Sequence, residues 1–418
     1  ESPITDLVSK QVQLRIQSGG LGLPNRHWIG YAAYVGSVVE AMPFINESLT
    51  NEVVVGSNWF DSLSSSLVSF NNYLAEKLPS DNTTKYTIDS LSQIYLDNSN
   101  KSLQKMLSDD LDIIRVSDFK SILSDRKDIL RYNSVSGLHA GDFLLSAPGD
   151  DSQTKNQQFF SNKAFSIALC FRLGLPLPIF TQRDNTTLIC DCNKSDKQID
   201  NLGYHIQNCA RGGGWHIRHE AIVRLFSSLC FCADMNHQLL SKNAHVYAMT
   251  DHSITPDIRF VSPGFTDVDH GNADVLADVR ITCPIGKTSM VSGSIAPGVS
   301  INSSRNQKNR KYSRISLQNG FYFMPLIMES FGAMDADMVN VIQHYSYKHA
   351  DIIGMKPNII FNYWCRRFST ALQLSMANFY IERVHSLNKR SSSSVFSSSS
   401  NNNTNNNIIT TVSNNILL

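Results

Sequence analysis

Three cysteines and one histidine near the middle of the chain form a compact set of soft metal ligands. Their spacing is Cys-x-Cys followed by His-x3-Cys, and the residues are Cys190, Cys192, His205 and Cys209. Thiolate and imidazole ligands in this combination favour tetrahedral zinc, and a site closed by four protein ligands is structural. Because the segment contains few apolar residues, metal binding would supply the free energy that folds it. The alternative is that the cysteines are buried thiols and that the histidine is unrelated to them.

Two aspartates lie in segments whose residues are typical of short β-strands. Asp257 is in the stretch 255–260 and Asp278 is in the stretch 276–282, and a turn-rich segment joins the two. A hairpin of these strands would bring both carboxylates together, and carboxylate oxygens are ligands that Mg²⁺ prefers. Phosphodiester hydrolysis needs a divalent metal, an activated water and positive charge at the transition state. The aspartates therefore predict a metal-dependent nuclease, although a Pro-Asp dipeptide by itself is common by chance.

The second of these strands also carries a basic residue at a position that matters for such chemistry. Arg280 stands two residues after Asp278, where nucleases with an Asp/Glu-x-Lys motif carry lysine. An arginine stays charged and cannot act as a base, but its planar guanidinium binds phosphate oxygens. We therefore expect Arg280 to contact DNA. A later basic cluster contains Lys308 and Lys311, and such a cluster is equally consistent with a solvated helix face.

The elements that must position these residues are mostly helices. From residue 60 to residue 130, apolar residues recur at helical spacing, which predicts several amphipathic helices with no residues for chemistry. The stretch 321–325 is typical of a further strand, and segments 335–350 and 358–385 are typical of amphipathic helices that close the core. The Ser- and Asn-rich end from 389 to 418 has too little apolar content to offset chain entropy, so we expect it to be disordered.

Length and composition exclude several classes of protein. The chain has 418 residues, enough for two or three domains, and its formal charge of +1 is not that of a strongly basic protein. Its 8 cysteines are too sparse for a disulfide scaffold, and their clustering suits metal ligation in a reducing compartment. No run of about 18 apolar residues and no signal peptide is present, so we expect no membrane span.

Several short motifs, taken in order, resemble the region that follows the reverse transcriptase in non-LTR retrotransposons with a restriction-like endonuclease. The motifs are QVQLRIQSGGLGL, AAYVGS, FLLSAPGD and ALCFRLGLPL, and the resemblance runs from about residue 11 to about residue 385. The chain has no Tyr/Phe-Xaa-Asp-Asp motif of a polymerase palm. Its first residue is Glu. We therefore expect a fragment of a longer reading frame or a processed product, whose reverse transcriptase would lie upstream.

The resemblance implies roles for residues that spacing alone does not assign. Arg218 and His219 stand where the family has an Arg-His pair, and Glu220 would be the carboxylate of the same helix. The stretch 307–312 is similar to the family's Lys-x-x-Lys-Tyr motif, which makes Lys308 the catalytic lysine and Lys311 its second candidate. The resemblance thus implies four catalytic residues and four DNA-binding residues, which are Asp257, Asp278, Lys308 and Glu220, and Arg218, His219, Arg280 and Lys311.

The family also places a CCHC zinc knuckle directly before the nuclease. The gap between Cys192 and His205 is longer than in the type members, so His216 is a substitute candidate for the fourth ligand. The cofactors implied are structural Zn²⁺ and catalytic Mg²⁺, the latter held by Asp257 and Asp278. The partners implied are target DNA and the element's RNA, and the location implied is the nucleus. Without the resemblance, the expected location is the cytoplasm.

These inferences predict an α+β protein in five parts. The parts are a helical region at 1–135, a helical linker at 136–188, a zinc knuckle at 189–214, a restriction-endonuclease-like domain of the PD-(D/E)xK type at 215–388, and a disordered tail at 389–418. The leading hypothesis for its function is an endonuclease that nicks target DNA so that the new 3′ end primes reverse transcription. The alternatives are an inactive nucleic-acid-binding remnant and a helical scaffold with buried Cys and His.

Overall fold

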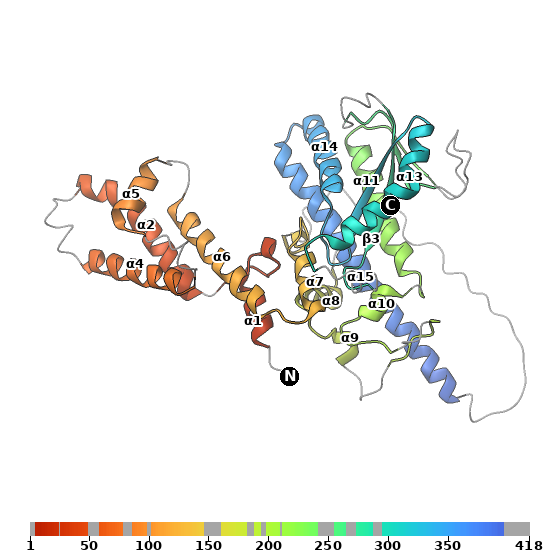
Figure 1. Cartoon of the computed structure of the whole chain (residues 1–418), viewed down its shortest axis with the longest axis horizontal. Helices are drawn as coiled ribbons and strands as arrows, with labels where there is room; N and C mark the ends of the chain where they lie inside the picture. The colour runs from red at the N-terminus through yellow and green to blue at the C-terminus, as the bar shows by residue number, and fades with distance from the viewer. Residues whose placement is uncertain are drawn as a thin grey trace, which may run out of the picture. The chain divides into compact units, whose positions relative to one another are not determined.

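The computed structural model describes residues 5–24, 26–48, 58–77, 86–97, 102–145, 160–181, 188–193, 198–209, 211–240, 255–264, 273–286 and 295–396. The chain divides into two compact units, Glu1–Asp125 and Arg126–Leu418. It is an α+β protein, mostly helical, with a four-stranded mixed sheet in the second unit (Figure 1). Within the described part of the chain, no helix is both long enough and apolar enough to cross a membrane.

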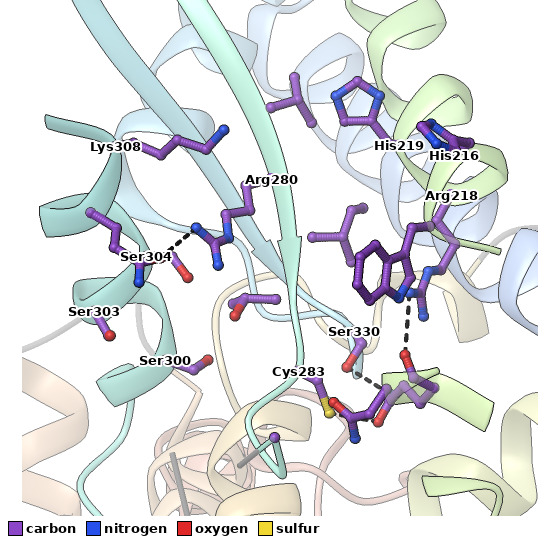
Figure 2. Close-up of a pocket in the computed structure, with 18 residues that line it drawn as sticks. His216, Arg218, His219, Arg280, Cys283, Ser300, Ser303, Ser304, Lys308 and Ser330 are labelled. Carbon is purple, nitrogen blue, oxygen red and sulfur yellow. Dashed lines mark hydrogen bonds between the residues drawn. The ribbon is translucent and has the colours of Figure 1, made fainter. Parts of the chain in front are cut away.

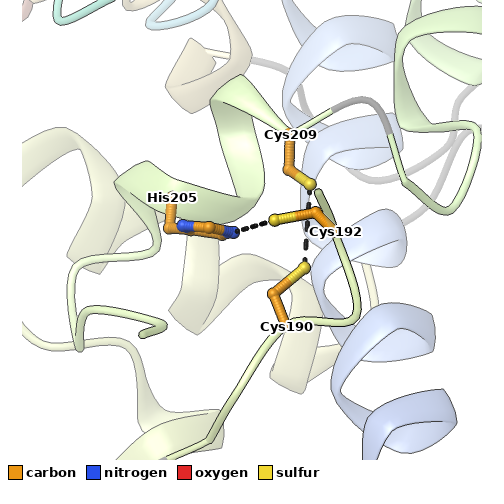
Figure 3. Close-up of side chains that lie close together, drawn as sticks. All are labelled: Cys190, Cys192, His205 and Cys209. Atoms are coloured by element: carbon orange, nitrogen blue, oxygen red, sulfur yellow. Dashed lines mark hydrogen bonds between the residues drawn. The ribbon is translucent and has the colours of Figure 1, made fainter. Parts of the chain in front are cut away.

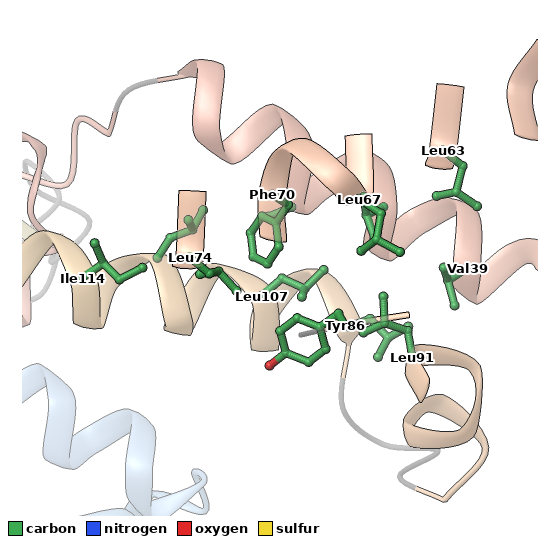
Figure 4. Packing of buried hydrophobic residues seen from close by; sticks show 13 residues of the cluster. Val39, Leu63, Leu67, Phe70, Leu74, Tyr86, Leu91, Leu107 and Ile114 are labelled. Carbon is green, nitrogen blue, oxygen red and sulfur yellow. The ribbon is translucent and has the colours of Figure 1, made fainter. Parts of the chain in front are cut away.

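The first unit is built only from helices within its described residues. They are α1 (Asp6–Gln13), the short 3-10 helix η1 (Ile16–Ser18), α2 (Arg26–Ser48), α4 (Asn58–Lys77), α5 (Ile88–Asp97) and α6 (Leu103–Ile122). On α4, Leu63, Leu67, Phe70 and Leu74 recur at helical spacing, and all four are buried against α2, α5 and α6 (Figure 4). The helical spacing seen in the sequence therefore predicts this core correctly.

The second unit surrounds its sheet with helices. Before the sheet come α7 (Arg126–Val135), the 3-10 helix η3 (Asp142–Leu145), α8 (Asn162–Leu173), α9 (Pro178–Thr181), α10 (Tyr204–Asn208) and α11 (Gly214–Cys232). The strands are β1 (His237–Leu239), β2 (Ile258–Phe260), β3 (Val275–Thr282) and β4 (Tyr322–Glu329), with α13 (Val299–Gln318) between the last two. Two long helices follow, α14 (Ala336–Ile353) and α15 (Pro357–Phe396).

The sheet has the order β1-β2-β3-β4. The first three strands are antiparallel neighbours, and β4 lies parallel to β3 along its whole length. The predicted hairpin is confirmed, because Ile258 of β2 pairs with Ala277 of β3. The β3–β4 pair is parallel, so its connection must cross over the sheet, and α13 provides that crossover.

The register of the strands decides which residues share a face. Directly paired residues lie on the same face, so Phe260 and Val275 lie on one face, and Leu276 and Phe323 lie on the other. Tyr312 of α13 packs on the second face, with its ring stacked on Phe323 at 4.9 Å between centroids. Because side chains alternate along β3, Asp278 and Arg280 point to the α13 side.

The opposite face is covered by α11 and α14, and α15 packs on these two helices. Phe260 contacts Phe226 of α11 and Tyr345 of α14, at 6.4 Å and 5.5 Å between ring centroids. Phe226 in turn packs on Phe368 of α15 at 4.7 Å. Because both faces of the sheet are covered, β3 is buried from Val275 to Val279. All residues of this stretch are apolar apart from Asp278, which is also buried.

Two expected boundaries differ from those of the structure. The division between compact units falls at Asp125, and α7 belongs to the second unit instead of ending the helical region at 135. The tail expected from 389 begins inside α15, which continues to Phe396. Ser and Lys tolerate a helix at a cost of only a few tenths of a kcal/mol per residue, so an existing helix extends into such a sequence. Residues 397–418 lie outside the described part.

Replacing Phe70 with Ala is expected to destabilise the first unit by about 3–5 kcal/mol, because the ring is fully buried and the cavity cannot refill. Chemical denaturation followed by circular dichroism measures the change. Val68→Ala on the same helix is the control, since Val68 is 58% exposed and its loss should cost little. Equal stability of the two variants would contradict this packing.

Candidate metal centre and adjoining polar cleft

The predicted zinc ligands come together in the structure. The ligand atoms of Cys190, Cys192, His205 and Cys209 all lie within 4.8 Å of one another (Figure 3). The sulfurs of Cys190 and Cys209 are 3.7 Å apart, and Cys192 Sγ lies 3.6 Å from His205 Nε2. A tetrahedron with zinc bond lengths has edges of about 3.8 Å for S–S and about 3.6 Å for S–N. The four donors therefore have the spacing of a closed tetrahedral site.

The neighbouring side chains hold these ligands in place. Asp200 accepts hydrogen bonds from the backbone amides of Tyr204 and His205, at 2.9 and 2.6 Å, so it caps the short helix that carries the histidine. Arg383 of α15 donates to Cys190 Sγ at 3.1 Å and pairs with Asp191. Donors of this kind stabilise a thiolate and orient it for a metal.

A glycine lets the metal segment approach α15 closely. Gly203 has a φ of 77°, and a Cβ there would lie 2.7 Å from a ring carbon of Tyr380. The hydroxyl of Tyr380 donates to the carbonyl of Gly203 at 3.0 Å. Any larger residue at 203 would push the segment off α15. Since His205 completes the set, the substitute candidate His216 is not needed, and it lies instead in the cleft described below.

Asp257 lies where β2 begins, and its carboxylate is held on two sides. Its Oδ2 accepts a hydrogen bond from the amide of Val279 at 2.7 Å and contacts His219 Nε2 at 2.9 Å. Burial lowers the pKa of His219, but the hydrogen bond and charge of Asp257, with the charges of Asp278 and Glu220, raise that pKa overall. His219 therefore carries more positive charge than an isolated histidine, and it orients Asp257.

Asp278 is the buried partner of this carboxylate. It is 4% exposed, and it forms an ion pair with the ammonium group of Lys308 on α13. Burial raises the pKa of Asp278, Lys308 lowers it and the charge of Asp257 raises it, and the overall direction is upward. The structure thus brings three predicted catalytic residues together, which are Asp257, Asp278 and Lys308.

Arg280 extends the same side of the strand. Its guanidinium donates to Gln307 Oε1 on α13 at 2.7 Å, one residue before Lys308. Both basic side chains therefore lie between β3 and α13, as Figure 2 shows. The bond to Gln307 fixes the direction of an arginine that is available to an anion.

Three other predicted residues lie away from the carboxylate pair. Glu220 is half-exposed, and it accepts a hydrogen bond from Arg224 at 2.8 Å on the surface of α11. Arg218 is buried, and it donates to Met376 Sδ at 2.9 Å and to the carbonyl of Gln207. Lys311 lies over the ring of its neighbour Tyr312 at 4.9 Å. His219, not Glu220, is thus the α11 residue that reaches the carboxylates.

A polar cleft of about 630 Å³ adjoins this group (Figure 2). It follows β3 from Val279 to Cys283, beyond the last residue that β2 pairs, so among the described residues it runs along an unpaired strand edge. Among its lining residues are Trp215, His216 and His219 from α11 and Ser304, Gln307 and Lys308 from α13. The cleft therefore has one wall on each of two helices, with the strand edge between them.

The sequence interpretation missed the serines and the glutamine of α13. Ser300, Ser304, Gln307 and Lys308 recur at intervals of three and four, so they share one helix face. This spacing can be seen in the sequence. It indicates a functional helix face only when Lys308 is already known to belong to a site.

Replacing Cys192 with Ser is expected to abolish stoichiometric zinc binding and to destabilise the segment 188–209, because one of four closed-site ligands is lost. Elemental analysis of purified protein measures the metal. Cys232→Ser is the matched control, since Cys232 lies at the end of α11 and outside the cluster. Unchanged zinc in Cys192→Ser would contradict the assignment.

No protein-family model matches this chain, and no curated protein matches it either.

Proposed function

We propose that the chain is a metal-dependent DNA endonuclease domain of retroelement origin. The observation that carries the proposal is the meeting of Lys308 with buried Asp278, beside Asp257, next to an open polar cleft that Lys308 and His219 line. Two carboxylates can hold a divalent metal and a lysine can stabilise the charge that develops on a phosphate, and metal-dependent phosphodiester hydrolysis uses both functions. A buried ion pair is also a poor choice for stability alone, which favours a functional role.

The order of the elements supports a restriction-endonuclease-like fold. A helix (α11) precedes three antiparallel strands, and a crossover helix (α13) leads to a fourth, parallel strand. The aspartates stand on the second and third strands, as the Pro-Asp and Asp/Glu-x-Lys pattern requires. The lysine comes from the crossover helix, in agreement with the Lys-x-x-Lys-Tyr resemblance.

The residues present fit a divalent cation. Asp278 is buried next to Asp257, and the negative charge of Asp257 raises the pKa of Asp278. The positive charge of Lys308 alone does not neutralise the two carboxylates. Both hydrogen bonds to Asp257 go to Oδ2, so Oδ1 is the oxygen that a cation would take. Mg²⁺ commonly uses one or two carboxylates and completes its shell with water and phosphate oxygens.

Each side chain then has a defined task. Magnesium, when bound, would polarise the phosphate and make water more acidic. Lys308 and Arg280 place positive charge where the phosphate gains negative charge, and the bond from Arg280 to Gln307 keeps that charge in place. His219 orients the carboxylate of Asp257. The cysteine and histidine cluster, with zinc, would hold the start of α11.

The biological setting is proposed from the motif resemblance. In that setting the domain nicks target DNA to prime reverse transcription in the nucleus, and it acts with an upstream reverse transcriptase and the element's RNA. The open cleft and its basic residues support a nucleic-acid ligand.

A second candidate is an inactive nucleic-acid-binding remnant. The observation that favours it is that each carboxylate already has a basic partner, Lys308 for Asp278 and His219 for Asp257. In addition, Glu220 supplies no third carboxylate. Such a remnant would keep zinc and bind DNA without cutting it.

Asp257→Asn and Asp278→Asn are each expected to reduce nicking of supercoiled plasmid on the order of 10²-fold or more with Mg²⁺ or Mn²⁺, because they remove the charge that holds the metal. Asp351→Asn is the control, since Asp351 is an exposed carboxylate of α14. Full activity in both site variants would show that the site is wrongly assigned. No cutting by the parent, with DNA still retained in a gel shift, would favour the remnant.

Lys308→Ala is expected to lower nicking by a similar factor, whereas Lys311→Ala on the same helix should leave it nearly unchanged, because Lys311 does not line the cleft. Glu220→Gln should also be nearly silent, since that carboxylate pairs with Arg224. The measurement is the initial nicking rate at saturating Mg²⁺. A large loss in Glu220→Gln would restore the role that the resemblance implies for it.

A further inference from the structure

The cleft has an aromatic wall that the proposed hydrolysis does not use. Trp215 lies at the start of α11, lines the cleft and is 52% exposed. Next along the chain, His216 also lines the cleft and Ile217 is 42% exposed. A tryptophan normally gains stability by burial, and exposed indoles at a polar cleft are typical of binding surfaces.

The position of this wall is fixed by close packing. A Cβ on Gly214 would lie 2.3 Å from a ring carbon of Phe379, so α11 begins in contact with α15 and only glycine fits there. Trp215 follows directly. The indole is therefore carried by a rigid helix start, although its own surface is open.

The opposite wall is suited to a phosphate. Arg280 is held by Gln307, and Lys308 lies one residue further along α13. Ser304 also lines the cleft and is 3% exposed. A hydroxyl beside two cations can donate a hydrogen bond to a phosphate oxygen.

We propose that the cleft binds an unpaired nucleotide of single-stranded DNA, with its base stacked on Trp215 and a neighbouring phosphate at Arg280 and Ser304. The DNA strand would cross the part of β3 that β2 leaves unpaired within the described residues, near Asp257 and Asp278. A volume of about 630 Å³ is in the range of pockets that hold one small molecule. Both faces of a base inside a duplex are covered by its neighbours, so Trp215 stacks only on a base that has left the stack.

This inference rests on the proposed function for the identity of the ligand, and it adds a preference. The nuclease would act where DNA is frayed, branched or already single-stranded, because extracting a base from intact duplex costs free energy. Stacking on an aromatic ring tolerates any base, so little sequence preference is expected from this wall.

The test measures binding of a fluorescently labelled thymidine oligonucleotide, and of a duplex of equal length, by anisotropy. Magnesium is omitted and zinc is retained, so that no cutting occurs. The parent should bind the single strand more tightly than the duplex. Trp215→Ala should weaken single-strand binding by about 5- to 150-fold, the usual loss for one stacked base. Trp215→Phe should recover much of that loss, because a phenyl ring also stacks.

Phe231→Ala is the matched control. Phe231 is on the same helix and 82% exposed, but it does not line the cleft, so its removal should leave binding unchanged. Zinc content and thermal unfolding of each variant verify the fold. Equal affinity of Trp215→Ala and parent for the single strand would overturn the inference, as would equal affinity of the parent for single strand and duplex.

The nicking assay separates this inference from the proposed function. A chain that nicks plasmid but binds single strands independently of Trp215 would contradict the stacking site alone. A chain that binds single strands through Trp215 but never nicks, under any divalent metal, would contradict the nuclease proposal alone.

Discussion

The second unit depends on one costly placement, a carboxylate on a strand that is buried on both faces. Asp278 is ionisable, 4% exposed and surrounded by the apolar residues of β3. The strand alternation turns its side chain towards α13, whose Lys308 lowers the pKa of Asp278 by its charge and its hydrogen bond, and the charge of His219 lowers that pKa as well. The crossover helix α13 therefore has two roles. It connects the parallel strands β3 and β4, and it carries the positive charge of Lys308 that compensates Asp278. Ionising an acid whose pKa is raised by folding costs folding free energy, and a bound cation would return part of it.

A short stretch of α15 connects the metal centre to the cleft. Arg383 contacts Cys190, Tyr380 contacts Gly203, and Phe379 contacts Gly214. These three residues lie within about one helical turn, so they form a single rigid support. The support fixes the ligands on one side and the first residue of α11 on the other. Loss of the metal would therefore change the positions of Trp215 and His219 through this support, without direct contact between these residues and the cluster.

Much of this arrangement could be predicted from the sequence, and the rest shows where periodicity fails. Strand-like patterns at 255–260 and 276–282 predicted the hairpin, and its register brings Asp257 and Asp278 together. The Cys and His spacing predicted the cluster, because ligands close in sequence can meet without help from distant elements. The helix residue that joins the carboxylates could not be predicted. His219 and Glu220 are adjacent, so about 100° of helix rotation separates them, and that rotation is set by Gly214 against Phe379.

Tertiary contacts also explain why Arg218 is buried. In the sequence, Arg218 and Arg280 are equal candidates for a phosphate contact, since both are charged and both adjoin predicted site residues. Arg218 lies one helix position from His219, on the side that faces α10 and α15, where Met376 and the carbonyl of Gln207 receive its donors. Burial lowers the pKa of Arg218, and although Arg218 lines the cleft, its donors already have these protein acceptors. Arg280 projects from the strand edge. Its guanidinium donates to Gln307 and to no other acceptor among the described residues, so its remaining donors can bind a ligand. Which basic residue can reach an anion is therefore decided by the tertiary contacts around each guanidinium, and charge patterns along the chain do not contain that information.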